Sequence, residues 1–74
     1  MIIKIKLFAT LQNNRFEINN FECSTETTVA EIINMLNIPE RDIAIIFINN
    51  KHAEFNTILK NNDTLALFPP VGGG

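Results

Sequence analysis

The sequence has little of what most catalytic and metal sites require. It contains one cysteine, Cys23, and one histidine, His52, among 74 residues. One Cys and one His cannot form a tetrahedral zinc site, so no bound metal is expected. We interpret Cys23 as a semi-buried loop residue and His52 as a surface residue of an edge strand, because no acid is placed to orient the histidine. A single cysteine also excludes an internal disulfide, which fits a reducing compartment.

Other absences exclude further classes of function. All three glycines stand at the end, so no glycine-rich phosphate loop is present. The net charge is −2, and no basic patch stands out that would favour nucleic-acid binding. Lysines interrupt the apolar N-terminal run "MIIKIKLFATL", which therefore lacks a signal-peptide layout, and no stretch has the length of a membrane span. These features predict a cytoplasmic protein that binds neither nucleic acid nor a membrane.

What is present is an apolar chain with clear periodicity. Hydrophobic residues make up 46% of it, enough for one small domain. "TVAEIINML" has apolar residues at helical spacing, and Thr28 with Glu31 matches a capping box, so we expect a helix over residues 29–37 that ends before Pro39. Alternating or β-branched runs predict strands over residues 2–8, 15–19, 43–49 and 64–68, with a short edge strand over 52–55.

The second predicted strand is assigned an inward face formed by Phe16 and Ile18, and the polar segment before it indicates a hairpin with the first strand. Asn62 stands in a turn where a left-handed residue is convenient. This order of elements predicts an α+β fold: a β-grasp (ubiquitin-like) roll with a mixed sheet of four to five strands and one main helix on one face. A right-handed crossover places the last strand parallel to the first, in the sheet centre. The domain is expected over residues 1–69, with a flexible C-terminal tail over 70–74.

Two phenylalanines suggest a binding surface. Phe8 lies on the lysine-bearing side of the first strand and Phe68 on the Thr/Ala side of the last, so neighbouring strands would place both rings on the sheet face opposite the helix. Such a pair is a candidate docking surface; ordinary scattered surface hydrophobes are the alternative.

The segment after the last strand has a composition suited to threading. Pro69 and Pro70 stop the strand and stiffen the chain, and Val71 is the last apolar side chain. Gly72, Gly73 and Gly74 then form a thin thread, and the five residues from Pro70 reach at most ~17 Å when extended. Such a thread can enter a channel that any side chain would block. The reactive group at its tip is the α-carboxylate of Gly74.

The order of elements, "TVAEIINML", "FINN", "LKNNDTLALFPPV" and the Gly-Gly end together resemble the small subunit of molybdopterin synthase, the MoaD family of ubiquitin-like sulfur carriers. The resemblance covers nearly the whole chain. It implies that a MoeB-like adenylating enzyme uses ATP to activate the carboxylate of Gly74, and that sulfur then displaces AMP to leave a thiocarboxylate. It also implies a MoaE-like large subunit that receives the tail. The two subunits would form a heterotetramer with this chain at both ends.

In such a synthase the thiocarboxylate sulfur attacks cyclic pyranopterin monophosphate, and two transfers give the dithiolene of molybdopterin. The resemblance makes Gly74 the sulfur-bearing residue and Gly73 its slim neighbour, and it aligns Phe8, Phe68 and His52 with or near an apolar docking face. Pro69, Pro70, Val71 and Gly72 would follow the tail into the partner. It implies no cofactor bound to the chain itself.

Three features depart from the family pattern. "ATLQNN" is shorter than the usual segment after the first strand, which often holds a small extra helix; Asn62 replaces the common turn glycine; and Gly72 stands where Ala, Ser or Thr is frequent. A short first hairpin is also typical of the sulfur carriers for thiamin thiazole synthesis, although those usually lack the Pro-Pro pair. A ubiquitin-like binding or modifier domain is a further alternative. The sulfur source, and molybdenum or tungsten as the end use, are left open.

Overall fold

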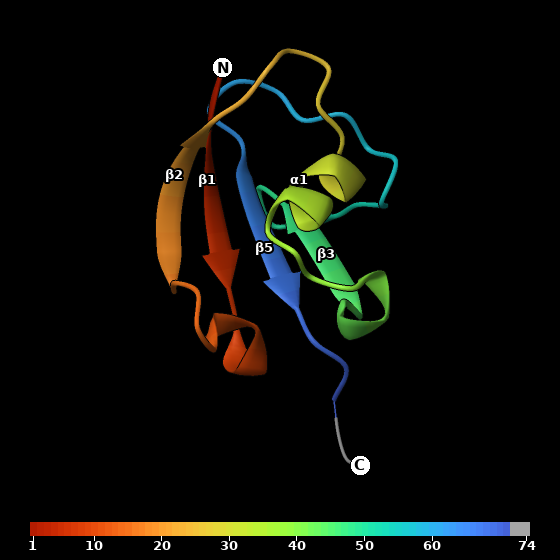
Figure 1. The fold of residues 1–74 in the computed structure, drawn as a ribbon. Helices are drawn as coiled ribbons and strands as arrows, with labels where there is room; N and C mark the ends of the chain where they lie inside the picture. The colour runs from red at the N-terminus through yellow and green to blue at the C-terminus, as the bar shows by residue number, and fades with distance from the viewer. Residues whose placement is uncertain (72–74) are drawn as a thin grey trace.

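The protein is described by a computed structural model over residues 1–71. A five-stranded mixed sheet, in the order β2-β1-β5-β3-β4, carries one helix, α1, across one face (Figure 1). The elements in chain order are β1 (Ile2–Leu7), η1 (Ala9–Gln12), β2 (Ile18–Glu22), α1 (Val29–Met35), η2 (Glu40–Asp42), β3 (Ile45–Ile48), β4 (Lys51–His52) and β5 (Thr64–Phe68). This is the α+β roll predicted from the order of the sequence patterns.

The first and last strands form the centre of the sheet. β1 and β5 are parallel, with Ile5 opposite Leu65 and Leu7 opposite Leu67. Alternation sends these side chains to the helix side, where each is at most 1% exposed. The predicted parallel placement of the two strands is therefore confirmed.

The helix has the ends that its sequence predicts. Thr28 and Glu31 form a complete capping box, in which the Thr28 Oγ1 accepts a hydrogen bond from the Glu31 N–H. At the other end Asn37 is left-handed, and the N–H of Ile38 donates to the carbonyl of Ile33, a Schellman arrangement with Asn in place of Gly. The helix ends at Met35, slightly before the predicted limit of residue 37.

The connection between β1 and β2 differs from the prediction. β1 and β2 pair antiparallel, as the predicted hairpin requires, but the connection contains the 3-10 turn η1 and β2 begins only at Ile18. The predicted inward position of Ile18 is wrong: it pairs with Lys6 and is 53% exposed. Phe21, opposite Ile3, faces the core instead, and Phe16 packs on it with ring centroids 5.3 Å apart. The alternation was assigned one residue out of phase because the strand begins after Phe16.

The second half returns through tight turns. Asn49 and Asn50 both have positive φ and join β3 to the two-residue strand β4, which lies slightly before the predicted range of 52–55. From there the chain runs back to the helix layer, where the carbonyl of Phe55 accepts a hydrogen bond from the Ala30 N–H. Asn62 is left-handed at φ 70°, as its place in the turn predicted.

Candidate functional site

An aromatic row crosses the face of the sheet opposite the helix. Phe8 and Phe68 stack with ring centroids 4.2 Å apart, as their predicted placement on neighbouring strands required. Phe47 meets Phe68 edge-to-face at 5.7 Å, and His52 meets Phe47 in the same manner at 5.1 Å. Three strands and the residue that follows β1 thus contribute to one row, which we call the aromatic row: Phe8, Phe68, Phe47 and His52.

Strand register explains why these rings meet. Ile45 stands opposite Phe68, and Phe47 stands opposite Ala66. All four lie on the open face, because their neighbours Ile46 and Leu67 point to the core. The small side chain of Ala66 leaves space beside the Phe47 ring. Phe47 was not among the predicted docking residues, although its alternation with the buried Ile46 was a signal for its place on the open face.

A groove of about 500 Å³ opens beside the aromatic row, at the end of the sheet where β5 finishes. One wall is η1, and the other is the chain that leaves β5. The lining residues are Phe8, Ala9, Thr10, Ile45, Phe68, Pro69, Pro70 and Val71. The structure therefore brings together all of the predicted docking residues that it describes except His52, which lies at the far end of the aromatic row.

The wall made by η1 is held in place from three directions. Leu11 is 3% exposed in the core, and the Gln12 side-chain amide donates to the carbonyl of Leu7 at 2.9 Å. The Arg15 guanidinium donates to the carbonyl of Asn37, just beyond the helix end, at 3.3 Å. The turn itself begins at Ala9, whose φ of 52° is unfavourable for a residue with a Cβ. The wall is thus a built feature of the groove.

The chain leaves the sheet directly after the aromatic row. The carbonyl of Phe68 accepts from the Ala44 N–H at 2.8 Å, and the two prolines that follow have no N–H to extend the ladder. Val71 is 95% exposed beyond them, and Figure 1 shows the chain pointing away from the sheet at this end. Gly72, Gly73 and Gly74 lie outside the described residues, so their assigned roles stay predictions.

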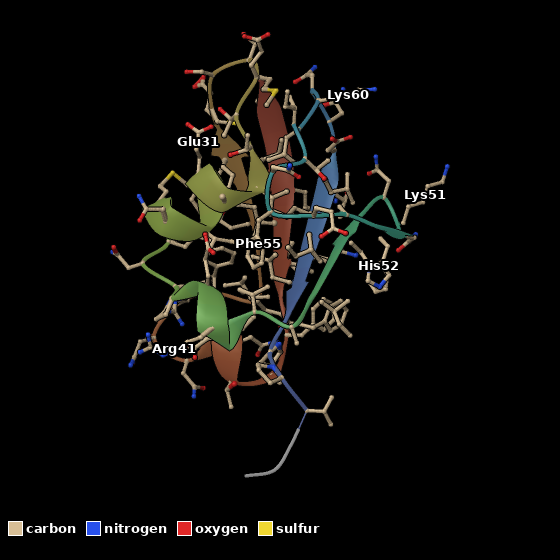
Figure 2. The ribbon with its side chains drawn as sticks, turned by 90° about the vertical axis from the view of Figure 1, so that its right-hand side faces the viewer. Glu31, Arg41, Lys51, His52, Phe55 and Lys60 are labelled. Atoms are coloured by element: carbon tan, nitrogen blue, oxygen red, sulfur yellow. The ribbon has the colours of Figure 1, made fainter. Side chains whose placement is uncertain are left out.

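The remaining candidates carry no chemistry of their own. Cys23 is half-buried in the loop between β2 and the helix, as predicted, and its carbonyl accepts a hydrogen bond from the N-terminal ammonium. His52 lies exposed on the open side of the sheet, away from Glu31 on the helix (Figure 2). Within residues 1–71 no group of His, Cys, Asp and Glu side chains could hold a metal ion. No helix in that range is long and apolar enough to cross a membrane.

A model of the ThiS family matches residues 5–74, nearly the whole chain. The chain belongs to the ThiS family. It is accordingly a small sulfur carrier of the ThiS type. No curated protein sequence matches it.

Solved structures agree on the fold of this ThiS-family domain. SAMP1 from Haloferax volcanii is 22% identical with a TM-score of 0.77, and each chain is covered to 100%. A putative molybdopterin converting factor subunit 1 from Pyrococcus furiosus is 21% identical with a TM-score of 0.77, over 96% of this chain and 99% of that one. A complex of subunits 1 and 2 of the molybdopterin-converting factor from Helicobacter pylori contains a chain that is 24% identical with a TM-score of 0.68, covered to 100% on both sides. These likenesses show the β-grasp fold.

Proposed function

We propose that this ThiS-family chain is the sulfur-carrying small subunit of a molybdopterin synthase, with Gly74 as the residue that bears the sulfur. The observation that carries the proposal is the position of the docking surface. The aromatic row and its groove lie where the chain leaves the sheet through Pro69 and Pro70. A partner that grips this face is therefore placed to receive the glycines that follow.

The chemistry assigns separate tasks to the two parts of the chain. A free carboxylate is a poor electrophile, so an adenylating enzyme uses ATP to convert the Gly74 carboxylate into an acyl-adenylate, from which AMP is a good leaving group. Sulfur then takes the place of AMP and leaves a thiocarboxylate. The folded domain supplies the grip, and the glycines keep the reactive end narrow enough to enter the active site of the large subunit, where cyclic pyranopterin monophosphate is the acceptor.

Support for the molybdopterin pathway comes from the tail sequence and from one relative in fold. The Pro-Pro pair before the glycines is typical of the MoaD carriers and is usually lacking in the thiazole carriers. The Helicobacter pylori chain of similar fold is one subunit of a two-subunit molybdopterin-converting factor. We therefore expect a MoaE-like large subunit as the partner, in a heterotetramer, and a MoeB-like enzyme as the activator.

The proposal is tested in two steps with purified proteins. Incubation with ATP, the cognate adenylating enzyme and a sulfur donor should exchange one terminal oxygen for sulfur, seen in the intact mass. Addition of the large subunit and cyclic pyranopterin monophosphate should then return the carboxylate form and yield molybdopterin. A thiocarboxylate that forms but is discharged only by thiazole synthase would contradict the molybdopterin role.

Removal of Gly74 provides the matched control. The shortened chain should form no productive thiocarboxylate, while its melting temperature should stay unchanged because no described core residue lies beyond Leu67. Normal sulfur transfer by this variant would overturn the assignment of the reactive residue.

A second candidate is a ubiquitin-like modifier whose tail is joined to lysines of other proteins. The observation that favours it is the fold that this chain shares over its full length with SAMP1, the small archaeal modifier protein 1 of Haloferax volcanii. Isopeptide adducts of Gly74 in cells, together with no thiocarboxylate, would support this alternative over the first.

A further inference from the structure

The open face of the sheet carries lysines beside its aromatic row. Lys4 and Lys6 alternate with the buried Ile3, Ile5 and Leu7, so both side chains stand on the face opposite the helix. Lys6 is two residues from Phe8 along β1, a Cα separation of about 7 Å. The apolar docking surface and the two ammonium groups are therefore parts of one continuous surface.

No carboxylate occupies a position next to these lysines across the strands. Every residue paired with Lys4 or Lys6 is uncharged: Ile18, Asn20, Thr64 and Ala66. Among the paired positions of the described strands, Glu22 is the one carboxylate on the open face, and it pairs with Ile2 at the opposite end of β1 from Phe8. The lysine charges beside the aromatic row are thus not balanced by neighbours in the sheet.

Five of the eight acidic residues belong to the helix layer or to the connections that lead to it. They lie on the helix, on η2 and in the connections attached to the helix layer: Glu26, Glu31, Glu40, Asp42 and Glu54. Figure 2 shows Glu31 on the helix side and His52 on the opposite side of the sheet. Although the net charge is −2, the lysines beside the aromatic row are therefore separated from these five carboxylates. Such a separation orients the molecule in the field of a charged partner.

We propose that Lys4 and Lys6 pair with carboxylates of the large subunit, at the rim of an apolar contact centred on Phe8 and Phe68. Charge complementarity indicates what the partner presents to these lysines. Burying an ammonium group at an interface without a partner costs free energy. An ammonium group that meets a carboxylate at the hydrated rim speeds and orients the encounter of the two proteins. The large subunit should thus present Asp or Glu side chains beside the apolar residues that cover the aromatic row. This inference rests on the proposed function.

Charge reversal with a matched control tests the inference. The double variant Lys4→Glu/Lys6→Glu and the control Arg41→Glu/Lys60→Glu change the net charge equally, but the control residues are exposed outside the strands, Arg41 on η2 and Lys60 in the connection before β5. Association with the large subunit is followed by stopped flow at several salt concentrations. We expect the first variant to lower the association rate about tenfold at low salt, and the control to change it less than about twofold.

One further variant and a spectroscopic control separate the effect of charge from an effect on folding. Lys4→Arg/Lys6→Arg keeps both charges and should associate like the wild type, and circular dichroism should give native spectra for all variants. For the wild type, the rate should fall as salt rises, because exposed charges are screened.

The outcomes distinguish the two proposals. An unchanged rate for Lys4→Glu/Lys6→Glu, with the wild type binding, overturns this inference and leaves the synthase role intact. Equal slowing by the control also overturns it, because net charge alone would then account for the effect. Wild-type protein that does not bind the large subunit contradicts both proposals.

Discussion

At the scale of residues, asparagine fills most of the left-handed backbone positions of this chain. Asn14, Asn37, Asn49, Asn50 and Asn62 all have φ between 52° and 70°. Asparagine tolerates this region better than other residues with a Cβ, so it replaces glycine at the helix end and in the turns. As a result the chain has no glycine between Met1 and Val71 and still makes its tight turns.

Replacement of Asn62 should show what this tolerance contributes. Asn62→Ala is expected to lower the free energy of unfolding by about 1 kcal/mol, because alanine is less stable at φ 70°, while the backbone hydrogen bond to the Ile2 carbonyl is kept. Urea unfolding measures the change. Asn56→Ala, at an exposed turn residue outside the left-handed region, is the control and should be neutral. Equal effects would contradict the explanation.

Phe68 is the residue on which partner binding should depend most, because it contacts both Phe8 and Phe47 in the aromatic row. Phe68→Ala is expected to weaken binding of the large subunit at least about tenfold in calorimetry, as loss of a central aromatic does at an interface. Met35→Ala removes an exposed apolar side chain from the helix and should leave the affinity unchanged. Wild-type affinity for the Phe68 variant would exclude the aromatic row as the contact.

At the scale of elements, sequence patterns predicted those whose signals are local. The capping box and the spacing of Val29, Ile32 and Ile33 defined α1, and the alternation of Ile3, Ile5 and Leu7 defined β1. β2 could not be predicted in the same way. Phe16 and Ile18 alternate as strand residues do, yet the chain enters the sheet only at Ile18, because η1 and Arg15 shape the connection through contacts with distant residues.

The candidate site was predictable only in part. Phe8 and Phe68 could be paired because handedness makes the first and last strands neighbours. The groove could not be predicted from the sequence. Its wall begins at Ala9, and alanine has no preference for the left-handed region that this residue adopts.

The capping box offers a test of independence between helix and site. Thr28→Ala should lower the free energy of unfolding by about 1 kcal/mol, because the Glu31 N–H loses the Oγ1 acceptor. Binding to the large subunit should keep its wild-type affinity at temperatures where the variant is folded, because α1 covers the face opposite the aromatic row (Figure 1). Thermal unfolding and calorimetry measure the two quantities. A loss of affinity in the folded variant would show that the helix contributes to docking.

At the scale of the whole molecule, one buried cluster joins nearly every element. It extends from Ile3 to Leu67 and includes residues of β1, η1, α1, β3 and β5. Because no part has a core of its own, unfolding should be a single transition. Guanidinium titrations followed by circular dichroism and by NMR peak intensities of isoleucine methyl groups should give one midpoint. A separate, earlier midpoint for the helix residues would contradict this expectation.

The parallel pairing of β1 with β5 also has a consequence for synthesis of the chain. The sheet cannot gain its central strand until residues 64–68 exist, and the predicted sulfur-bearing segment follows that strand directly. A molecule broken off before β5 lacks Leu65 and Leu67 from the core and should not fold. Such fragments should therefore not compete with intact carriers for the proposed partner, since the docking face forms only in chains that have been completed at least as far as Phe68.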